Sequence, residues 1–301
     1  MCLQIDALYQ SPNLGVWDVR CRPESRLRGP EEWTETALVA FPRTGVFLKR
    51  VNGVEFVADP NQVVFFNAGE SYHCAHPVGE GDDCTTYAFP TDVLEEVVGE
   101  YAIGGRGRAG YAFDRTHFPL DSPTAWKQHG LRRQVLRPEA DGLRVEEDAL
   151  HLLAAIVRGM YAVSAADDAA RSATGVRRRR AEQIRLLLAE RYADDLNLEQ
   201  IGRATGCSAF HAARVFRSET GVTVHHYRNQ LRLRHALERL AGREKDLATL
   251  ARDLGFSSHG HFSDAFRAAF GISPSACRSG ADRKWFREKS KILEAGSVGA
   301  S

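Results

Sequence analysis

The sequence lacks several features that define common protein classes. No apolar run approaches the roughly 18 residues of a membrane-spanning helix, so no membrane association is expected. The first residues lack the basic start and apolar core of a signal peptide, so a cytoplasmic protein is expected. There is no nucleophile-elbow motif, phosphate-binding loop or dinucleotide fingerprint, and none of the six cysteines forms a Cys-x-x-Cys pair. These absences argue against an enzyme and against a disulfide framework, and no cofactor is predicted.

The charge of the chain is unevenly distributed. The 301 residues carry a net charge of +1. Residues 177–280 hold 18 Lys and Arg against 11 Asp and Glu, a net charge of +7, and residues 281–301 hold +2. Residues 1–176 therefore hold −8. A basic C-terminal part joined to an acidic N-terminal part is typical of a nucleic-acid-binding module attached to a domain that does not contact DNA.

One motif occurs twice in the last third of the chain, at 198–221 and again at 247–271. Each copy predicts a short helix, a glycine turn and a second helix that ends at a glycine. The turn glycines, Gly206 and Gly255, are expected to adopt positive φ, where a Cβ would clash. This is the layout of a helix-turn-helix, whose second helix enters the major groove of DNA. Two tandem copies predict a double-stranded DNA-binding domain.

The stretch 254–274 resembles the signature of the AraC/XylS family of bacterial transcriptional regulators, and the likeness covers about 179–278. The resemblance implies an α+β protein: a β-rich, cupin-like N-terminal barrel with helices, and an all-α C-terminal domain of two helix-turn-helix motifs joined by a long helix. It also implies a homodimeric activator that acts with RNA polymerase. The expected divisions are a sensing or dimerisation domain at 1–165, a linker at 166–178, the DNA-binding domain at 179–280 and a flexible tail at 281–301.

Local patterns predict individual elements. Runs rich in Val, Phe, Thr and Tyr predict strands at 36–41, 45–51, 54–57, 63–66 and 85–89. Asn52-Gly53, between two of these runs, predicts a hairpin. Helices are predicted at 92–98, 122–136, 145–163, 181–192 and 224–240. The helix at 145–163 is amphipathic, and its apolar face either packs on the barrel or forms part of a dimer interface.

The start of each second helix is expected to face the DNA bases. Ser208, and Ser257 or Ser258, are expected to cap these helices. Arg214 is the favoured base contact, because arginine can bond O6 and N7 of guanine together, and Asp264 either reads cytosine N4 or weakens its half of the contact. The predicted DNA-binding residues are Ala209, Phe210, Ala213, Arg214, Arg217, Arg232, Ser258, His259, Gly260, Ser263, Asp264 and Arg267. Among them Arg232, like Arg228 and Arg234 on the same long helix, is expected either to contact phosphates or to pair with Glu238 or solvent.

Four roles remain open for the N-terminal part. It binds a small-molecule effector in an apolar pocket, for which the candidates are Phe41, Phe47, Phe56, Phe65 and Tyr72. Alternatively it senses a metal ion or thiol oxidation, for which the weaker candidates are Cys21, His73, Cys74, His76 and Cys84. In a third role it is a cupin enzyme fused to a DNA-binding module, although the His-x-His of cupin metal motifs is missing from the early strands. In the fourth it binds no effector and only dimerises or recruits another protein.

Strand alternation limits the second role. The segment 73–76 is strand-like, so neighbouring side chains point to opposite faces. Only His73, or Cys74 together with His76, can point into the barrel. The role that the sequence favours is a sequence-specific transcription regulator, an activator controlled by a small-molecule effector, with a metal- or thiol-responsive regulator as the alternative.

Overall fold

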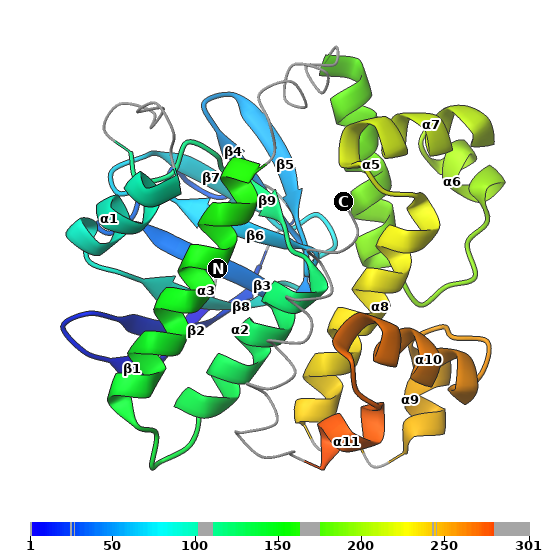
Figure 1. The fold of residues 1–301 in the computed structure, drawn as a ribbon. Coiled ribbons are helices and arrows are strands. Elements are labelled where there is room, and N and C mark those ends of the chain that lie inside the picture. The colour runs from blue at the N-terminus through cyan, green and yellow to red at the C-terminus, as the bar shows by residue number, and fades with distance from the viewer. Residues whose placement is uncertain are drawn as a thin grey trace.

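The structure is a computed structural model that describes residues 2–24, 26, 28–101, 111–162, 175–242, 244 and 246–279 (Figure 1). The tail expected at 281–301 lies outside these residues, as does most of the linker expected at 166–178. The last part of that linker range, from Gly175 onward, is instead the exposed first turn of a helix.

The N-terminal part contains two antiparallel sheets. One has the strand order β1-β2-β8-β3-β6-β9 and the other the order β5-β4-β7. The strands are β1 (Cys2–Gln10), β2 (Gly15–Arg22), β3 (Leu38–Gly45), β4 (Phe47–Val51), β5 (Val54–Ala58), β6 (Gln62–Phe66), β7 (Tyr72–Ala75), β8 (Asp82–Ala88) and β9 (His117–Pro119). Asn52 and Gly53 both have positive φ and join β4 to β5, with Val51 opposite Val54, which confirms the predicted hairpin.

Apolar side chains fill both faces of the six-stranded sheet. On one face they pack against α1 (Thr91–Tyr101), α2 (Ser122–Val135) and α3 (Gly142–Ala162). On the other face a smaller cluster, which includes Phe47, Phe56 and Val64, lies between the two sheets. The buried face of α3 belongs to the first core, so the packing role predicted for this helix is confirmed. The fold is α+β, as predicted, with a β-rich N-terminal domain whose described strands form two sheets and not the closed barrel that the family resemblance implies.

The C-terminal part is all-helical. Its helices are α5 (Gly175–Glu190), α6 (Leu198–Ala204), α7 (Ala209–Thr220), α8 (Val224–Ala241), α9 (Leu247–Asp253), α10 (His259–Phe270) and α11 (Pro274–Arg278). The helix α8 links two apolar clusters. One packs α5, α6 and α7 around Phe216 and Leu231, and the other packs α9, α10 and α11 around Phe262 and Phe266. Figure 1 shows the helical part beside the sheets, with one unit at each end of α8.

Candidate DNA-binding surface

Each helix-turn-helix unit is built by local capping. In the first unit Gly206 has φ of 67°, and the Ser208 side chain accepts a hydrogen bond from the backbone N–H of His211 at 3.2 Å. Gly221, in the left-handed conformation, ends the helix α7. These features confirm the predicted turn and cap, and they leave the other N–H groups at the start of α7 available to an anion.

The second unit repeats this design. Gly255 has φ of 79°, and Ser258 accepts from the backbone N–H of His261 at 3.1 Å. Gly271, at φ of 72°, ends α10. Of the two serines that the sequence offered as the cap, the structure selects Ser258. The recognition helices α7 and α10 therefore begin and end in the same way.

The outer faces of α7 and α10 are exposed. Phe210 is 75% exposed, and the Arg214 guanidinium lies 5.8 Å from its ring centre, so the two side chains share one surface. The other predicted contacts on these two helices are exposed or half-buried: Ala209, Ala213, Arg217, Ser258, His259, Gly260, Ser263, Asp264 and Arg267. This surface is open to a large ligand.

The arginines of α8 lie elsewhere than the sequence suggested. Arg232 is 5% exposed, and its guanidinium donates to the carbonyl oxygens of Tyr192 and Asp194 at 2.7 and 3.1 Å. Arg228 donates to the Leu196 carbonyl at 2.8 Å. Both side chains thus bind the connection between α5 and α6. A guanidinium held inside the protein is not available to a phosphate, so the phosphate-contact prediction for Arg232 is wrong.

Arg234 points to the other domain. It is 5% exposed and donates to the Leu120 carbonyl at 2.9 Å, and burial lowers its pKa to about 10. Beside it, Trp126 of α2 is fully buried and stacks on Phe270 of α10, with ring centres 5.7 Å apart. The DNA-binding part is therefore packed directly on the N-terminal domain.

A buried polar cluster forms the centre of this junction. The Tyr227 hydroxyl of α8 donates to Asp59 Oδ2 at 2.7 Å, and Asn61 Nδ2 donates to the Tyr227 carbonyl at 3.0 Å. Burial raises the pKa of Asp59 to about 6, although the bond from Tyr227 opposes the shift. From α5, the Glu182 carboxylate accepts the backbone N–H of Val57 at 2.8 Å. The junction is specific because each partner is desolvated and hydrogen-bonded.

An ion-pair network extends the junction along α8. Arg43 of β3 bonds Glu238 of α8 at 2.8 Å and lies 3.4 Å from Asp18 of β2. Arg132 of α2 bonds the same Asp18 at 2.6 Å. Burial alone would raise the pKa of Asp18, but the two arginines lower it overall. Glu238, a predicted partner for arginines on its own helix, is paired across the domains instead. Sequence reasoning did not find Asp18 or Arg43, because nothing near them in the chain signals their partners.

The predicted pocket aromatics do not line one cavity. Phe41 and Phe65 belong to the core shared with α1–α3. Phe47 and Phe56 lie between the two sheets, on the other face. Tyr72 is also buried, and its ring lies 5.0 Å from the Lys49 ammonium. Phe41 and Phe65 point to the helix-covered face of the six-stranded sheet, whereas Phe47 and Phe56 come from β4 and β5 of the other sheet, which is why this prediction was wrong for the five residues as a set.

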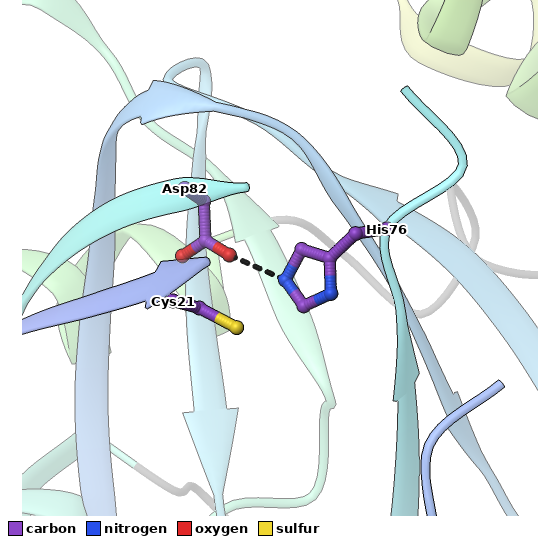
Figure 2. Close-up of side chains that lie close together, drawn as sticks. All are labelled: Cys21, His76 and Asp82. Carbon is purple, nitrogen blue, oxygen red and sulfur yellow. Dashed lines mark hydrogen bonds and ion pairs between the residues drawn. The ribbon is translucent and has the colours of Figure 1, made fainter. Parts of the chain in front are cut away.

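Of the predicted metal or thiol residues, the structure brings Cys21, His76 and Cys84 close to one carboxylate. His76 Nε2 lies 2.7 Å from Asp82 Oδ1 (Figure 2). The Cys84 thiol donates to Asp82 Oδ2 at 3.1 Å. Burial lowers the pKa of His76, but hydrogen bonds with Asp82 and Cys21 outweigh it and raise the pKa to about 9. Asp82 was missed by the sequence prediction.

The two remaining candidates separate as strand alternation requires. Cys74 packs against the apolar cluster between the sheets, whereas His73 is half-buried and bonds the Gly29 carbonyl at 3.3 Å. Of the two alternatives that strand alternation allowed, Cys74 and His76 are therefore the residues whose side chains point inward.

The paired capped helices and their exposed faces define a tandem helix-turn-helix protein, a class that binds DNA. Residues 201–280 match the model of a helix-turn-helix domain. This C-terminal region is an AraC-type DNA-binding domain, and the relatives that it resembles are transcriptional regulators of the AraC family. No helix in the described part of the chain is long and apolar enough to cross a membrane.

Individual relatives differ in how much of the chain they match. The uncharacterized HTH-type transcriptional regulator YbfI of Bacillus subtilis is 23% identical over 77% of this chain and 80% of its own length. The HTH-type transcriptional activator RhaS of Escherichia coli is 35% identical, over 34% of this chain and 38% of RhaS. Thus the chain spans most of YbfI but well under half of RhaS.

The chain also resembles two solved structures. Apo ToxT of Vibrio cholerae is 11% identical over 89% of this chain and 97% of ToxT, with a TM-score of 0.40. A transcriptional regulator of Chromobacterium violaceum with an AraC-type DNA-binding domain is 24% identical over 36% of this chain and 98% of its own, with a TM-score of 0.34.

Proposed function

We propose that this protein is a sequence-specific transcriptional activator whose N-terminal domain controls it in response to a small-molecule effector. The observation that carries the proposal is the exposure of the outer faces of α7 and α10, while α5, α8 and the buried end of α10 contact the N-terminal domain. Activation is proposed because RhaS, which resembles the DNA-binding domain, is named as an activator. The setting is the cytoplasm, and the activator's partner is RNA polymerase.

The DNA contacts fall into two kinds. Arg214 reads a guanine, and Phe210 beside it packs on a thymine methyl group. Arg217 and Arg267, at the far ends of the two helices, contact phosphates and fix the register. Ser258, His259 and Asp264 face the second half-site with a less basic surface. Because Arg232 is buried, the proposed phosphate contacts come from α7 and α10 alone.

Control passes through the junction between the domains. The junction is buried and polar, so an effector that alters the sheets would change the bonds to Tyr227 and Glu238. Of the aromatic residues first considered, Phe47, Phe56 and Tyr72 remain the effector contacts that we propose, because they lie between the sheets or at their edge. A homodimer is proposed through α3, where Leu143 is 80% exposed.

The test is selection of bound DNA from a random pool by the full-length protein. A selected site with two half-sites about one helical turn (~34 Å) apart is expected. Arg214→Ala should lose about 1–3 kcal/mol at one base pair and relax the preference there. The matched control, Arg217→Ala, should weaken binding to all sequences alike. If no sequence is enriched, or if Arg214→Ala keeps the native preference, the proposal fails.

A further inference from the structure

Three ligand-type side chains converge inside the N-terminal domain, away from the DNA-binding surface (Figure 2). One ligand atom from each of Cys21, His76 and Asp82 lies within 4.8 Å of the other two. All three residues are buried, with exposures of 6%, 5% and 5%. In the described part of the chain, this is the cluster where three such groups approach closely enough to share one ion.

The fold holds these groups together through strand register. Cys21 of β2 and Asp82 of β8 are direct partners in an antiparallel ladder, so their side chains point to the same face. His76 follows β7, and the turn that leads back to β8 passes through Gly79 and Gly81, both at positive φ. The cluster therefore joins two adjacent strands and the connection that precedes one of them.

A fourth ligand-type side chain, which adds a second sulfur, lies beside the cluster. Cys84 is two residues beyond Asp82 on the same strand, so it shares the inward face, and it is 5% exposed. Its thiol contacts Asp82 Oδ2 at 3.1 Å, while Asp82 Oδ1 contacts His76. An imidazole alone would satisfy this buried carboxylate as an ion pair. Two buried thiols around the same carboxylate are better explained by a cation that all four groups share.

We propose that Cys21, His76, Asp82 and Cys84 bind one thiophilic divalent cation of the Zn²⁺ class. Two thiolates, one imidazole and one carboxylate suit such an ion in tetrahedral geometry, in which neighbouring ligand atoms are about 3.5 Å apart. The ligand atoms of Cys21, His76 and Asp82, which lie within 4.8 Å of one another, need only small side-chain rotations to reach it. The Cys84 thiol, 3.1 Å from Asp82 Oδ2, supplies the fourth ligand. The cation holds β2, β8 and the β7–β8 connection together. Its binding releases to solvent the protons of the two thiols and the proton between His76 and Asp82. This assignment does not depend on the proposed regulation of transcription.

The experiment uses the full-length protein, purified without added metal under reducing conditions. It is titrated with Co²⁺ alone and then with Zn²⁺ alone. The expected result is one Co²⁺ per chain, with the absorption of a tetrahedral ion and a sulfur-to-cobalt charge-transfer band, and complete displacement by one equivalent of Zn²⁺. Zn²⁺ should also raise the melting temperature, because it binds only the folded site.

Conservative variants identify the ligands. Cys21→Ser, Cys84→Ser and Asp82→Asn should each weaken Co²⁺ binding at least tenfold, with a weaker charge-transfer band for the two serine variants. Cys74→Ser removes a nearby thiol and should bind like the native chain, as should Cys277→Ser in the other domain. Circular dichroism of each metal-free variant checks that it is folded, and Asp82→Asn keeps the shape of the site if a serine variant unfolds.

Three outcomes would overturn the assignment. The first is the absence of stoichiometric metal binding by the native chain. The second is loss of binding in Cys74→Ser with retention in Cys21→Ser and Cys84→Ser. The third is a native chain that binds no Co²⁺ but forms a disulfide between Cys21 and Cys84 on mild oxidation, detected by mass spectrometry, since the pair would then be a thiol switch.

Discussion

Arginine side chains in the C-terminal domain divide into two groups by what their guanidinium contacts. Arg214 and Arg217 are exposed on α7. Arg232 instead fills the interior between α8 and the α5–α6 connection, where it donates to two backbone carbonyls. Burial, together with the positive charge of Arg228, lowers its pKa to about 10, so it remains charged at neutral pH. The same residue type thus serves recognition in one place and architecture in another.

Arg232→Ala should therefore affect stability and leave DNA recognition intact. Removing the guanidinium leaves the carbonyls of Tyr192 and Asp194 without their donor, at a cost of about 1–3 kcal/mol in the free energy of unfolding. Urea denaturation measures this loss. In folded variant protein, the dependence of DNA affinity on salt should match that of the native chain.

Arg217→Ala is the matched control and should give the opposite pattern. Because its side chain is exposed, the free energy of unfolding should change by less than about 0.5 kcal/mol. Its DNA affinity should fall, and the slope of log affinity against log salt concentration should decrease by about one released counterion. If Arg232→Ala unfolds like the native chain and its DNA affinity depends less steeply on salt, Arg232 contacts a phosphate, as the sequence suggested.

Residues whose role is set by near neighbours were predictable, and residues with distant partners were not. Ser208 caps a helix by accepting from an N–H three residues away, and Gly206 is required by the positive φ at its own position. Both roles could therefore be predicted from the sequence. The role of Arg232 depends on a carbonyl 40 positions earlier, and Asp82 is a ligand candidate only because it pairs with Cys21. Local sequence patterns do not predict contacts between residues so far apart in the chain.

At the level of elements, the two recognition helices depend on their serine caps. Ser208→Ala and Ser258→Ala should each lower the free energy of unfolding by about 1 kcal/mol, because one backbone N–H loses its acceptor. Each should also weaken DNA binding, since the first turn carries the proposed contacts. Electrophoretic mobility shifts on the selected site measure the second effect.

Ser273→Ala provides the control for the capping variants. Ser273 caps α11, a helix with no proposed DNA contact, and accepts from the backbone N–H of Ala276 at 3.2 Å. Its loss should cost a similar stability and leave DNA affinity unchanged. Equal losses of affinity in all three variants would mean that global stability, rather than the recognition helices, sets binding.

Elements with strong local signals were predicted, and their assembly was not. The Asn52-Gly53 hairpin and the long helices formed where the sequence indicated. The strands β1, β2 and β9 were not assigned individually, because β1 and β2 are less uniformly apolar and β9 is only three residues long. Phe41 and Phe47 fall into different clusters because β3 belongs to the six-stranded sheet and β4 to the three-stranded sheet. The effector pocket could not be predicted without that order.

At the scale of the whole molecule, a carboxylate buried between the domains makes stability depend on pH. Asp59 is 0% exposed and accepts from Tyr227 and from the backbone N–H of Asn61. Burial raises its pKa to about 6, against about 3.9 in an unfolded chain. The folded protein thus holds this proton more tightly. The resulting stabilisation is complete below about pH 4 and is lost as the pH rises through about 6.

Asp59→Asn should remove this dependence, because an amide does not ionise yet can still accept one bond. Relative to the native chain, the free energy of unfolding of the variant should rise between pH 4 and pH 7, by on the order of 1–3 kcal/mol. His129 and His235, whose pKa values burial lowers to about 3 and about 4, act in the opposite direction in both chains and cancel in the difference. Urea denaturation at several pH values measures this difference in the free energy of unfolding. Asp264→Asn, at an exposed position, is the control. A difference that stays constant with pH would mean that Asp59 is ionised at the junction and that its charge is compensated by Arg185, which lowers its pKa.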